Sequence, residues 1–196
     1  MAFVLTIDQR GSARHRGHDP IPGWADSLNR DVAAWLQLPF ERTVGDEIQG
    51  VARDPEAVVG TIRTAARLQT WYVGIGIGEA TFAESSRASR GPAFERARHA
   101  VEAAKKHTVP IQLIGESSPV THHAQTALIT LYTLLSERTE QGWRVADLAR
   151  TTRTLTEVAV KLGITKQSVG RTARRAHIEL ERDLSSLATY LLNESA

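Results

Sequence analysis

The sequence contains no cysteine, which excludes disulfide scaffolds, thiolate zinc sites and cysteine nucleophiles. It also lacks any apolar run near the roughly 18 residues that would indicate a membrane span. The apolar stretch at residues 1–7 is short, has no basic segment ahead of it and is followed by Asp8 and Arg10, unlike a secretion signal. We therefore expect a cytoplasmic protein that is stabilised by packing. Its 196 residues, 41% of them hydrophobic, suffice for one large or two small domains.

The chain has little net charge, +2, but this charge is unevenly distributed. Residues 1–149 hold 16 basic and 17 acidic side chains, and residues 176–196 carry a net charge of −3. Residues 150–175 carry seven basic side chains against one acid, Glu157, which gives this block a net charge of +6. A merely solvated helix face would spread its charge more evenly, so the block predicts a polyanionic partner for this part of the chain alone.

The first half of the chain alternates between strand and helix patterns. The periodicity predicts strands at 3–7, 40–44, 47–52, 70–78 and 111–114, and helices at 24–38, 54–68 and 92–107. Glycines interleave the strand at 70–78, which is typical of a strand that another backbone or a ligand approaches closely. The order β-α-β-β-α-β-α-β places two β-α-β crossovers around a hairpin. It predicts the α/β (α+β) class, with a palm-like or ferredoxin-like sheet domain over residues 1–116.

The second half is helical throughout, after a linker-like segment at 115–119. We predict an all-α domain over residues 117–196 with a helix-turn-helix at 154–177. Thr156 is expected to cap the first helix of this motif and Thr165 the second. Gly163 permits the left-handed turn between them, and Val169 is expected to face the first helix.

This helix-turn-helix predicts binding to double-stranded DNA, because a major groove admits one helix whose early residues meet base edges. Gln167 suits adenine, Arg171 suits guanine, and Ser168 suits a base or a phosphate. The remaining cations suit backbone phosphates. The complete predicted DNA-binding set is Arg153, Lys161, Thr165, Lys166, Gln167, Ser168, Arg171, Arg174 and Arg175. The alternative is an ordinary helical hairpin with a polar face.

Two apolar stripes, at 124–137 and 184–192, suit either the core of a bundle or a dimer seam. DNA readers of this kind usually act as dimers on two half-sites, so we expect a homodimer. Together these features predict a DNA-binding transcriptional regulator whose first domain is a sensor.

The acids of the first half indicate a second site. Asp8 ends the first strand and Asp46 lies in the predicted hairpin turn, so both carboxylates could meet at one sheet edge and hold Mg²⁺. Backbone amides around Gly11 and Ser12 would then cradle the phosphates of a nucleotide. The simpler interpretation is that one acid caps a strand end and the other belongs to a turn.

Residues 1–115 resemble class III nucleotidyl cyclases and their diguanylate cyclase relatives. The resemblance rests on VLTIDQRGS at 4–12, RTVGDEIQGV at 42–51, GIGIG at 74–78 and GPAFERARHAVEAAK at 91–105, which occur in that order and at about that spacing. The whole chain also looks like the SatD-like bacterial family, proteins of poorly defined function with a DNA-binding segment at their C-terminal end.

The cyclase resemblance implies a role for several residues. Arg42 falls at the position that selects the purine, so the implied ligand is a purine nucleotide with Mg²⁺. Glu95 replaces the asparagine that orients the ribose, and His99, or Arg98 in a shifted register, falls at the transition-state arginine. The resemblance therefore implies a degenerate cyclase fold that binds a nucleotide. Two alternatives stay open: an active nucleotidyl cyclase or related Mg-dependent phosphoryl-transfer enzyme, and a module whose C-terminal helices bind another protein.

Overall fold

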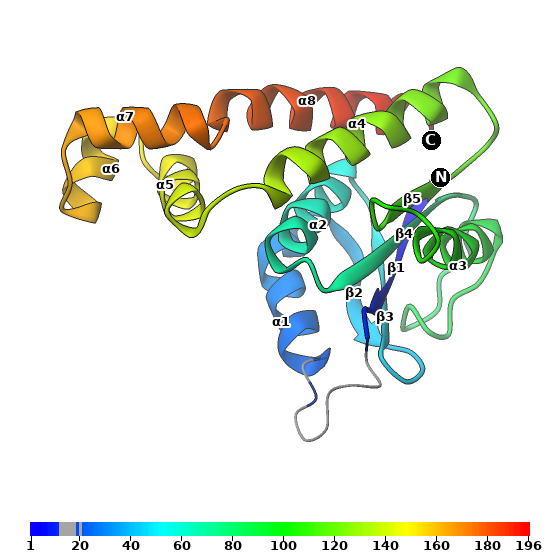
Figure 1. The fold of residues 1–196 in the computed structure, drawn as a ribbon. Helices are drawn as coiled ribbons and strands as arrows, with labels where there is room; N and C mark the ends of the chain where they lie inside the picture. The colour runs from blue at the N-terminus through cyan, green and yellow to red at the C-terminus, as the bar shows by residue number, and fades with distance from the viewer. Residues whose placement is uncertain (12–18, 20) are drawn as a thin grey trace.

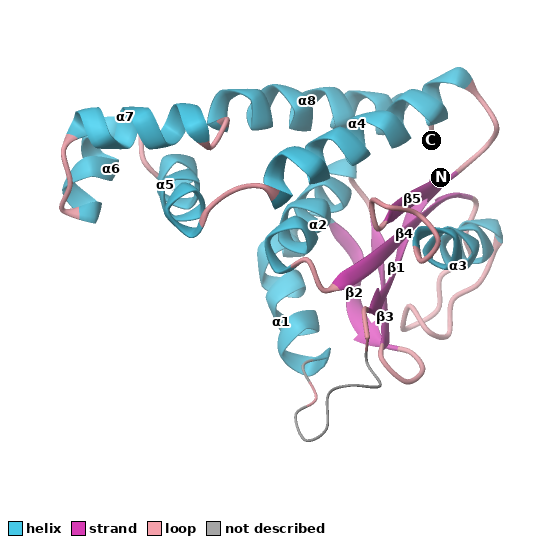
Figure 2. Cartoon of the chain, viewed as in Figure 1, coloured by secondary structure: helices cyan, strands magenta, loops and turns pink. Residues whose placement is uncertain are grey.

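The computed structural model describes residues 1–11, 19 and 21–196, and these form a mixed α/β protein (Figures 1 and 2). The described residues form five strands, eight α-helices and one short 3-10 helix. In chain order the elements are β1 (Ala2–Gln9), α1 (Ile21–Val32), η2 (Ala33–Trp35), β2 (Leu36–Arg42), β3 (Glu47–Ala52), α2 (Pro55–Leu68), β4 (Trp71–Gly78), α3 (Pro92–Ala104), β5 (Ile111–Ile114), α4 (Pro119–Ser136), α5 (Glu140–Thr151), α6 (Leu155–Leu162), α7 (Lys166–Arg175) and α8 (Ile178–Glu194).

The five strands form one sheet in the order β2-β3-β1-β4-β5. β1 runs antiparallel to both of its neighbours, and β5 runs parallel to β4. Alternate residues of β1 point to opposite faces, as the strand period requires. Phe3, Leu5 and Ile7 pack in the core with α1 and α2, whereas Ala2 and Val4 pack with α3. The sheet is therefore covered by helices on both faces, which explains why β1 is apolar along most of its length.

The glycines of β4 allow α3 to lie directly on the sheet. A Cβ at Gly74 would come within 2.2 Å of the backbone nitrogen of Val101, and one at Gly76 within 2.1 Å of the carbonyl oxygen of Ala93. Both distances are far shorter than a van der Waals contact. Close approach of another backbone, one of the two explanations offered by the sequence, therefore accounts for the glycine-rich strand.

The predicted boundary between the first helix and the second strand is wrong. The helix expected at 24–38 ends at Val32, and β2 begins at Leu36 rather than at residue 40. Pro39, the residue after the helix predicted at 24–38, lies inside β2. This is tolerated because β2 is an edge strand, where register shifts relieve the pairing and a missing N–H costs little. The hairpin to β3 and the remaining strands lie close to their predicted positions.

The two long helices α4 and α8 pack on the sheet and the helices α1, α2 and α3 that cover it, which we together call the sheet module. Leu128 and Leu131 of α4 and Leu192 of α8 are buried in the same core as Leu5 and Ile62. Helices α5, α6 and α7 instead share a separate small core, and Figure 1 shows them extending away from the sheet beyond α4 and α8. We refer to α5, α6 and α7 as the three-helix unit. Within the described part of the chain, no helix has the length and apolar character needed to cross a membrane.

Candidate nucleic-acid interface

The three-helix unit is held together by a few small apolar side chains. Val145 of α5, Val158 and Ala159 of α6 and Val169 of α7 are buried against one another. The predicted inward position of Val169 is confirmed, since its side chain is fully buried. So small a core fixes the relative positions of the helices while leaving most of the α7 surface to solvent.

Caps define where α6 and α7 begin. The cap of α6 is Thr154 rather than the predicted Thr156: its hydroxyl accepts a hydrogen bond from the Glu157 backbone nitrogen at 3.2 Å. The Glu157 carboxylate in turn accepts from the backbone nitrogen of Arg153, one residue before the cap, so the start of α6 is held by two reciprocal hydrogen bonds. Gly163 ends α6 with φ 65°, and Thr165 caps α7 by accepting from the Ser168 nitrogen at 3.2 Å. The Thr165 hydroxyl is therefore used to position α7.

One side of α7 carries only polar and cationic side chains, and all of them are exposed. We call this side the cationic face; it consists of Lys166, Gln167, Arg171, Arg174 and Arg175. Ser168, at its edge, is half-buried. Helix α7 packs mainly on α5, α6 and α8, and the side chains of the cationic face are left exposed by the part of the chain that the structure describes.

The basic side chains of the 150–175 block are left without acidic partners. Within the described part of the chain, none of its seven cations takes part in an ion pair. Arg153 and Lys161, at the two ends of α6, are exposed like the α7 cations. The structure therefore brings the predicted DNA-binding residues together on the three-helix unit, with their charge unneutralised.

A half-buried glycine, Gly170, lies next to the cationic face of α7. A Cβ at Gly170 would meet no atom within 4 Å, so nothing inside the molecule requires a glycine there. A glycine in a helix interior costs about 0.5–1 kcal/mol relative to alanine. Gly170 lies three residues after Gln167 and four before Arg174, so the missing side chain leaves the helix backbone uncovered between them.

The C-terminal end of α7 is fixed by Arg138, which follows α4. The Arg138 guanidinium donates two hydrogen bonds to the carbonyl oxygen of Ala176, at 3.1 and 2.6 Å. A cation at this end also interacts favourably with the helix dipole. The same guanidinium lies 2.8 Å from the Glu181 carboxylate, and both side chains are nearly inaccessible to solvent.

Glu181 connects this end of α7 to the sheet module. Its second carboxylate oxygen accepts from Nε of Arg63, on α2, at 3.0 Å. Arg63 also pairs with Asp147 of α5, and Arg67 pairs with Asp147 at 2.8 Å and with Glu140 at 3.3 Å. Partial burial acts to raise the pKa of Asp147, but the hydrogen bonds and charges of Arg63 and Arg67 outweigh it and hold that pKa below its usual value.

Trp143 of α5 completes this connection. The guanidinium groups of Arg63, Arg67 and Arg138 lie 4.8, 5.4 and 4.7 Å from the centre of its ring. Trp143 is buried, so these cation–π contacts are shielded from water. We call Arg63, Arg67, Arg138, Glu140, Trp143, Asp147 and Glu181 the arginine network. Sequence reasoning missed it because its members lie up to 118 residues apart.

The second predicted site lies where the end of β1 meets the turn between β2 and β3. Asp8 pairs in register with Glu47, so the backbone next to Asp46 lies beside the end of β1, as predicted. The Asp8 carboxylate, however, forms an ion pair with Lys105 at the end of α3. Partial burial acts to lower the pKa of Lys105, but the Asp8 and Glu102 carboxylates hold it above its usual value. The ammonium group of Lys105 thus already neutralises Asp8.

The other residues predicted to bind the nucleotide either contact other residues of the chain or face solvent. Arg42 pairs with Asp19 and donates to the carbonyl oxygen of Gly45. Gly11 has φ 71°, a turn conformation, and Ser12 lies outside the described residues. Glu95, Arg98 and His99 are exposed on α3. No group of three or more histidine or acidic side chains that could hold a metal ion occurs among the described residues. A metal ion at Asp8 would have to compete with the ammonium group of Lys105.

Comparison of this chain with protein-family models, with curated proteins and with solved structures gives no significant match.

Proposed function

We propose that this protein is a DNA-binding transcriptional regulator, in which α6 and α7 form a helix-turn-helix and α7 enters the major groove. The observation that carries the proposal is the exposed, unpaired state of the 150–175 cations. Exposed cations such as Arg30 and Arg98 elsewhere in the chain also lack an ion pair within the described residues, but only the 150–175 block sets seven cations against a single acid. Cations that a protein leaves unneutralised on one surface favour a polyanion, and a helix of this kind fits a major groove.

The positions of the side chains along α7 assign their roles. Gln167 and Arg171 lie four residues apart on the exposed side of α7, so they meet neighbouring base edges when α7 lies in the major groove. Ser168 lies where it meets either a base or a phosphate. Lys166, Arg174 and Arg175 flank them and bind phosphates, together with Arg153, just before α6, and Lys161 of α6. Gly170 lets the α7 backbone approach the floor of the groove.

We further propose that the regulator acts as a homodimer. Helix α8 exposes Leu180, Leu187 and Tyr190 to the extent of 46%, 47% and 59%. Their spacing of seven and three residues places them along one side of the helix. A second copy of α8 would cover this stripe and set the separation of two α7 helices.

In this proposal the sheet module is a palm-like sensor, and ligand binding to it changes the DNA affinity of α7. The strand order supports a ferredoxin-like core, since β3 lies between β1 and β2 and β4 flanks β1. A nucleotide with Mg²⁺ would first have to displace Lys105 from Asp8. A thermal-shift panel of purine nucleotides with and without Mg²⁺ tests this part, because ligands that bind the native state raise its apparent stability.

Selection from a random duplex pool tests the regulator proposal. The full chain should enrich one motif, in two copies of opposite orientation if the protein dimerises. The doubly substituted Gln167→Ala, Arg171→Ala chain should enrich no motif. The control Arg182→Ala changes an exposed side chain of α8 and should enrich the same motif as the native chain. Enrichment of no motif by the native chain would contradict sequence-specific binding.

A further inference from the structure

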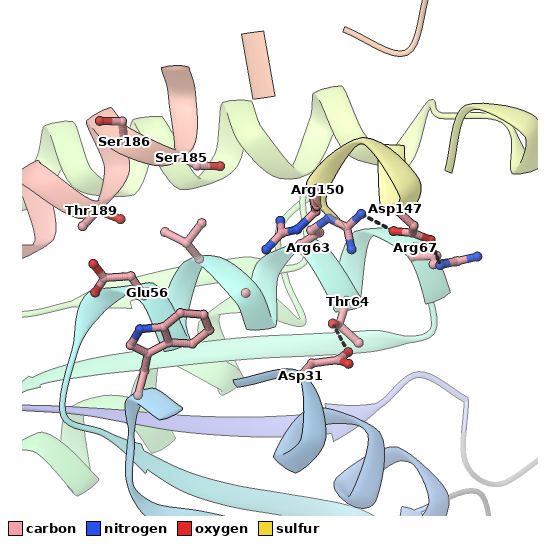
Figure 3. Close-up of a pocket in the computed structure, with 13 residues that line it drawn as sticks. Asp31, Glu56, Arg63, Thr64, Arg67, Asp147, Arg150, Ser185, Ser186 and Thr189 are labelled. Atoms are coloured by element: carbon pink, nitrogen blue, oxygen red, sulfur yellow. Dashed lines mark hydrogen bonds and ion pairs between the residues drawn. The ribbon is translucent and has the colours of Figure 1, made fainter. Parts of the chain in front are cut away.

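A groove of about 550 Å³ lies between the sheet module and the three-helix unit. One side of α2 forms its floor, and α5, α8 and the end of α1 form its walls (Figure 3). Its volume is in the range of pockets that hold small organic ligands. The groove does not include the cationic face or the sheet edge at Asp8, so neither predicted site accounts for it.

Most charges in this groove are already paired. Arg63 and Arg67 bind Asp147, and Thr64 donates to Asp31 at 3.2 Å. Two charged side chains are different: Glu56 and Arg150 are exposed, and neither makes a hydrogen bond or an ion pair with any part of the chain that the structure describes. Arg150 belongs to the basic 150–175 block but lies on the groove rather than on the cationic face.

Three hydroxyl groups of α8 line the same groove, from Ser185, Ser186 and Thr189. Hydroxyls inside helices usually bond the carbonyl four residues back. Thr126 and Thr130 of α4 do so, at 3.0 and 2.8 Å, whereas the three α8 hydroxyls make no such bond within the described chain. They are free to bond a molecule in the groove.

The two unpaired charges lie toward opposite ends of the groove. Figure 3 shows Arg150 near Arg63, with Glu56 farther along α2 below Thr189. Glu56 and Arg63 are seven residues apart on α2, which corresponds to about 10 Å of helix. A ligand that satisfied both charges would therefore carry a cation and an anion separated by about that distance.

We propose that this groove binds a small zwitterion with charges about 10 Å apart, which is the span of an extended tripeptide. Its ammonium group bonds Glu56, its carboxylate bonds Arg150, and the α8 hydroxyls bond its central amide groups. Such a ligand touches α2 of the sheet module and α5 and α8 at once. Because Arg63 and Asp147 also line the groove, its binding acts on the same contacts that orient α7.

The test is calorimetric titration of the full chain with trialanine, up to about 10 mM. Saturable binding is expected, and it should weaken about tenfold when the peptide is N-acetylated and again when its carboxylate is amidated, because each change removes one charged bond. Glu56→Gln should abolish the preference for the free amine, and Arg150→Gln the preference for the free carboxylate. Glu84→Gln and Arg144→Gln remove exposed charges that do not line the groove, so they are matched controls and should bind as the native chain does.

Absence of saturable trialanine binding, or equal binding of the blocked peptides, would overturn the proposal. So would binding that Glu56→Gln and Arg150→Gln leave unchanged. The coupling of the groove ligand to α7 rests on the proposed function. A separate titration with duplex DNA, in the absence of peptide, distinguishes a failure of the DNA-binding proposal from a failure of the groove proposal. Failure with DNA but not with trialanine removes only the regulator, and the reverse removes only the groove ligand.

Discussion

Arg63 of α2 and Glu181 of α8 form an ion pair, with Nε and Oε1 3.0 Å apart, across the boundary between the sheet module and the helices that carry α7. Glu181 also binds Arg138, which donates to the carbonyl oxygen of Ala176 at the C-terminal end of α7. The position of the proposed DNA-reading helix thus depends on a buried carboxylate and two arginines. Every change to this pair should affect both stability and DNA binding.

Glu181→Gln should reduce the free energy of unfolding by about 3–5 kcal/mol, because it removes the acidic partner of the buried Arg138 guanidinium and one of the two acidic partners of Arg63. Urea denaturation measures this loss. Glu179→Gln, two residues away on the same helix and exposed, is the control and should change stability by less than about 0.5 kcal/mol. Similar small losses in both variants would contradict the role given to the arginine network.

The contribution of Asp147 should depend on pH. Its pKa is lowered in the folded protein by Arg63 and Arg67, so its stabilising effect is fully present above the ordinary carboxyl value of about 4 and is lost as the pH falls through the lowered pKa. The gap in unfolding free energy between the native chain and Asp147→Asn should be constant above about pH 5 and narrow below about pH 4. Urea titrations across this range measure it; a gap that widens in acid would contradict the assignment.

Gly170→Ala should separate folding from binding. The substitution should raise the free energy of unfolding by about 0.5–1 kcal/mol, since the added methyl meets nothing and alanine favours the helix. The same methyl should weaken duplex binding, because it points toward the partner. Gly163→Ala is the contrasting control: its φ of 65° makes alanine unfavourable, and stability should fall by about 1 kcal/mol. Unchanged DNA affinity in Gly170→Ala would mean that α7 does not approach the duplex closely.

Substitution of two arginines of α7 should change DNA binding in different ways. Arg171→Ala should cost about 1–3 kcal/mol on the selected motif and relax specificity at one base pair. Arg175→Ala should weaken binding to all sequences about equally and reduce the salt slope by about one. Competition titrations with single-base variants of the motif distinguish the two outcomes. Identical behaviour of both variants would contradict direct base reading by Arg171.

Local patterns were enough to predict much of the fold. The strands at 47–52, 70–78 and 111–114 lie within a residue or so of β3, β4 and β5, because strand period and turn residues are local properties. The turn at Gly163 and the cap at Thr165 are confirmed for the same reason. The mixed α/β class followed from the order of these elements.

What the sequence could not supply depends on contacts between distant segments. Pro39 was expected to end a helix, and only the position of β2 at the sheet edge explains its place in a strand. Helix α5 was not separated from its neighbours, although Thr139 caps it and Trp143 and Ala146 recur at helical spacing. The pairing of Asp8 with Lys105 joins residues far apart in the chain and left no local signal.

The division at residue 116 and the likeness to cyclases and to the SatD-like family stay predictions. The core shared by α4, α8 and the sheet joins residues on both sides of that division. Leu128 and Leu192, for example, pack in the same cluster as Ile75 of β4. The three-helix unit, by contrast, has a core of its own around Val158 and Val169.

The central claim is that the cationic face of α7 binds duplex DNA, and a salt series measured by fluorescence anisotropy tests it most directly. If four to six of the unpaired cations contact phosphates, the logarithm of the binding constant should fall against the logarithm of salt concentration with a slope of about −4 to −5. The doubly substituted Lys166→Ala, Arg175→Ala chain should lose about two units of slope, while Arg182→Ala should keep the native value. Absence of saturable binding at low salt, or a slope unchanged by the double substitution, would contradict the claim.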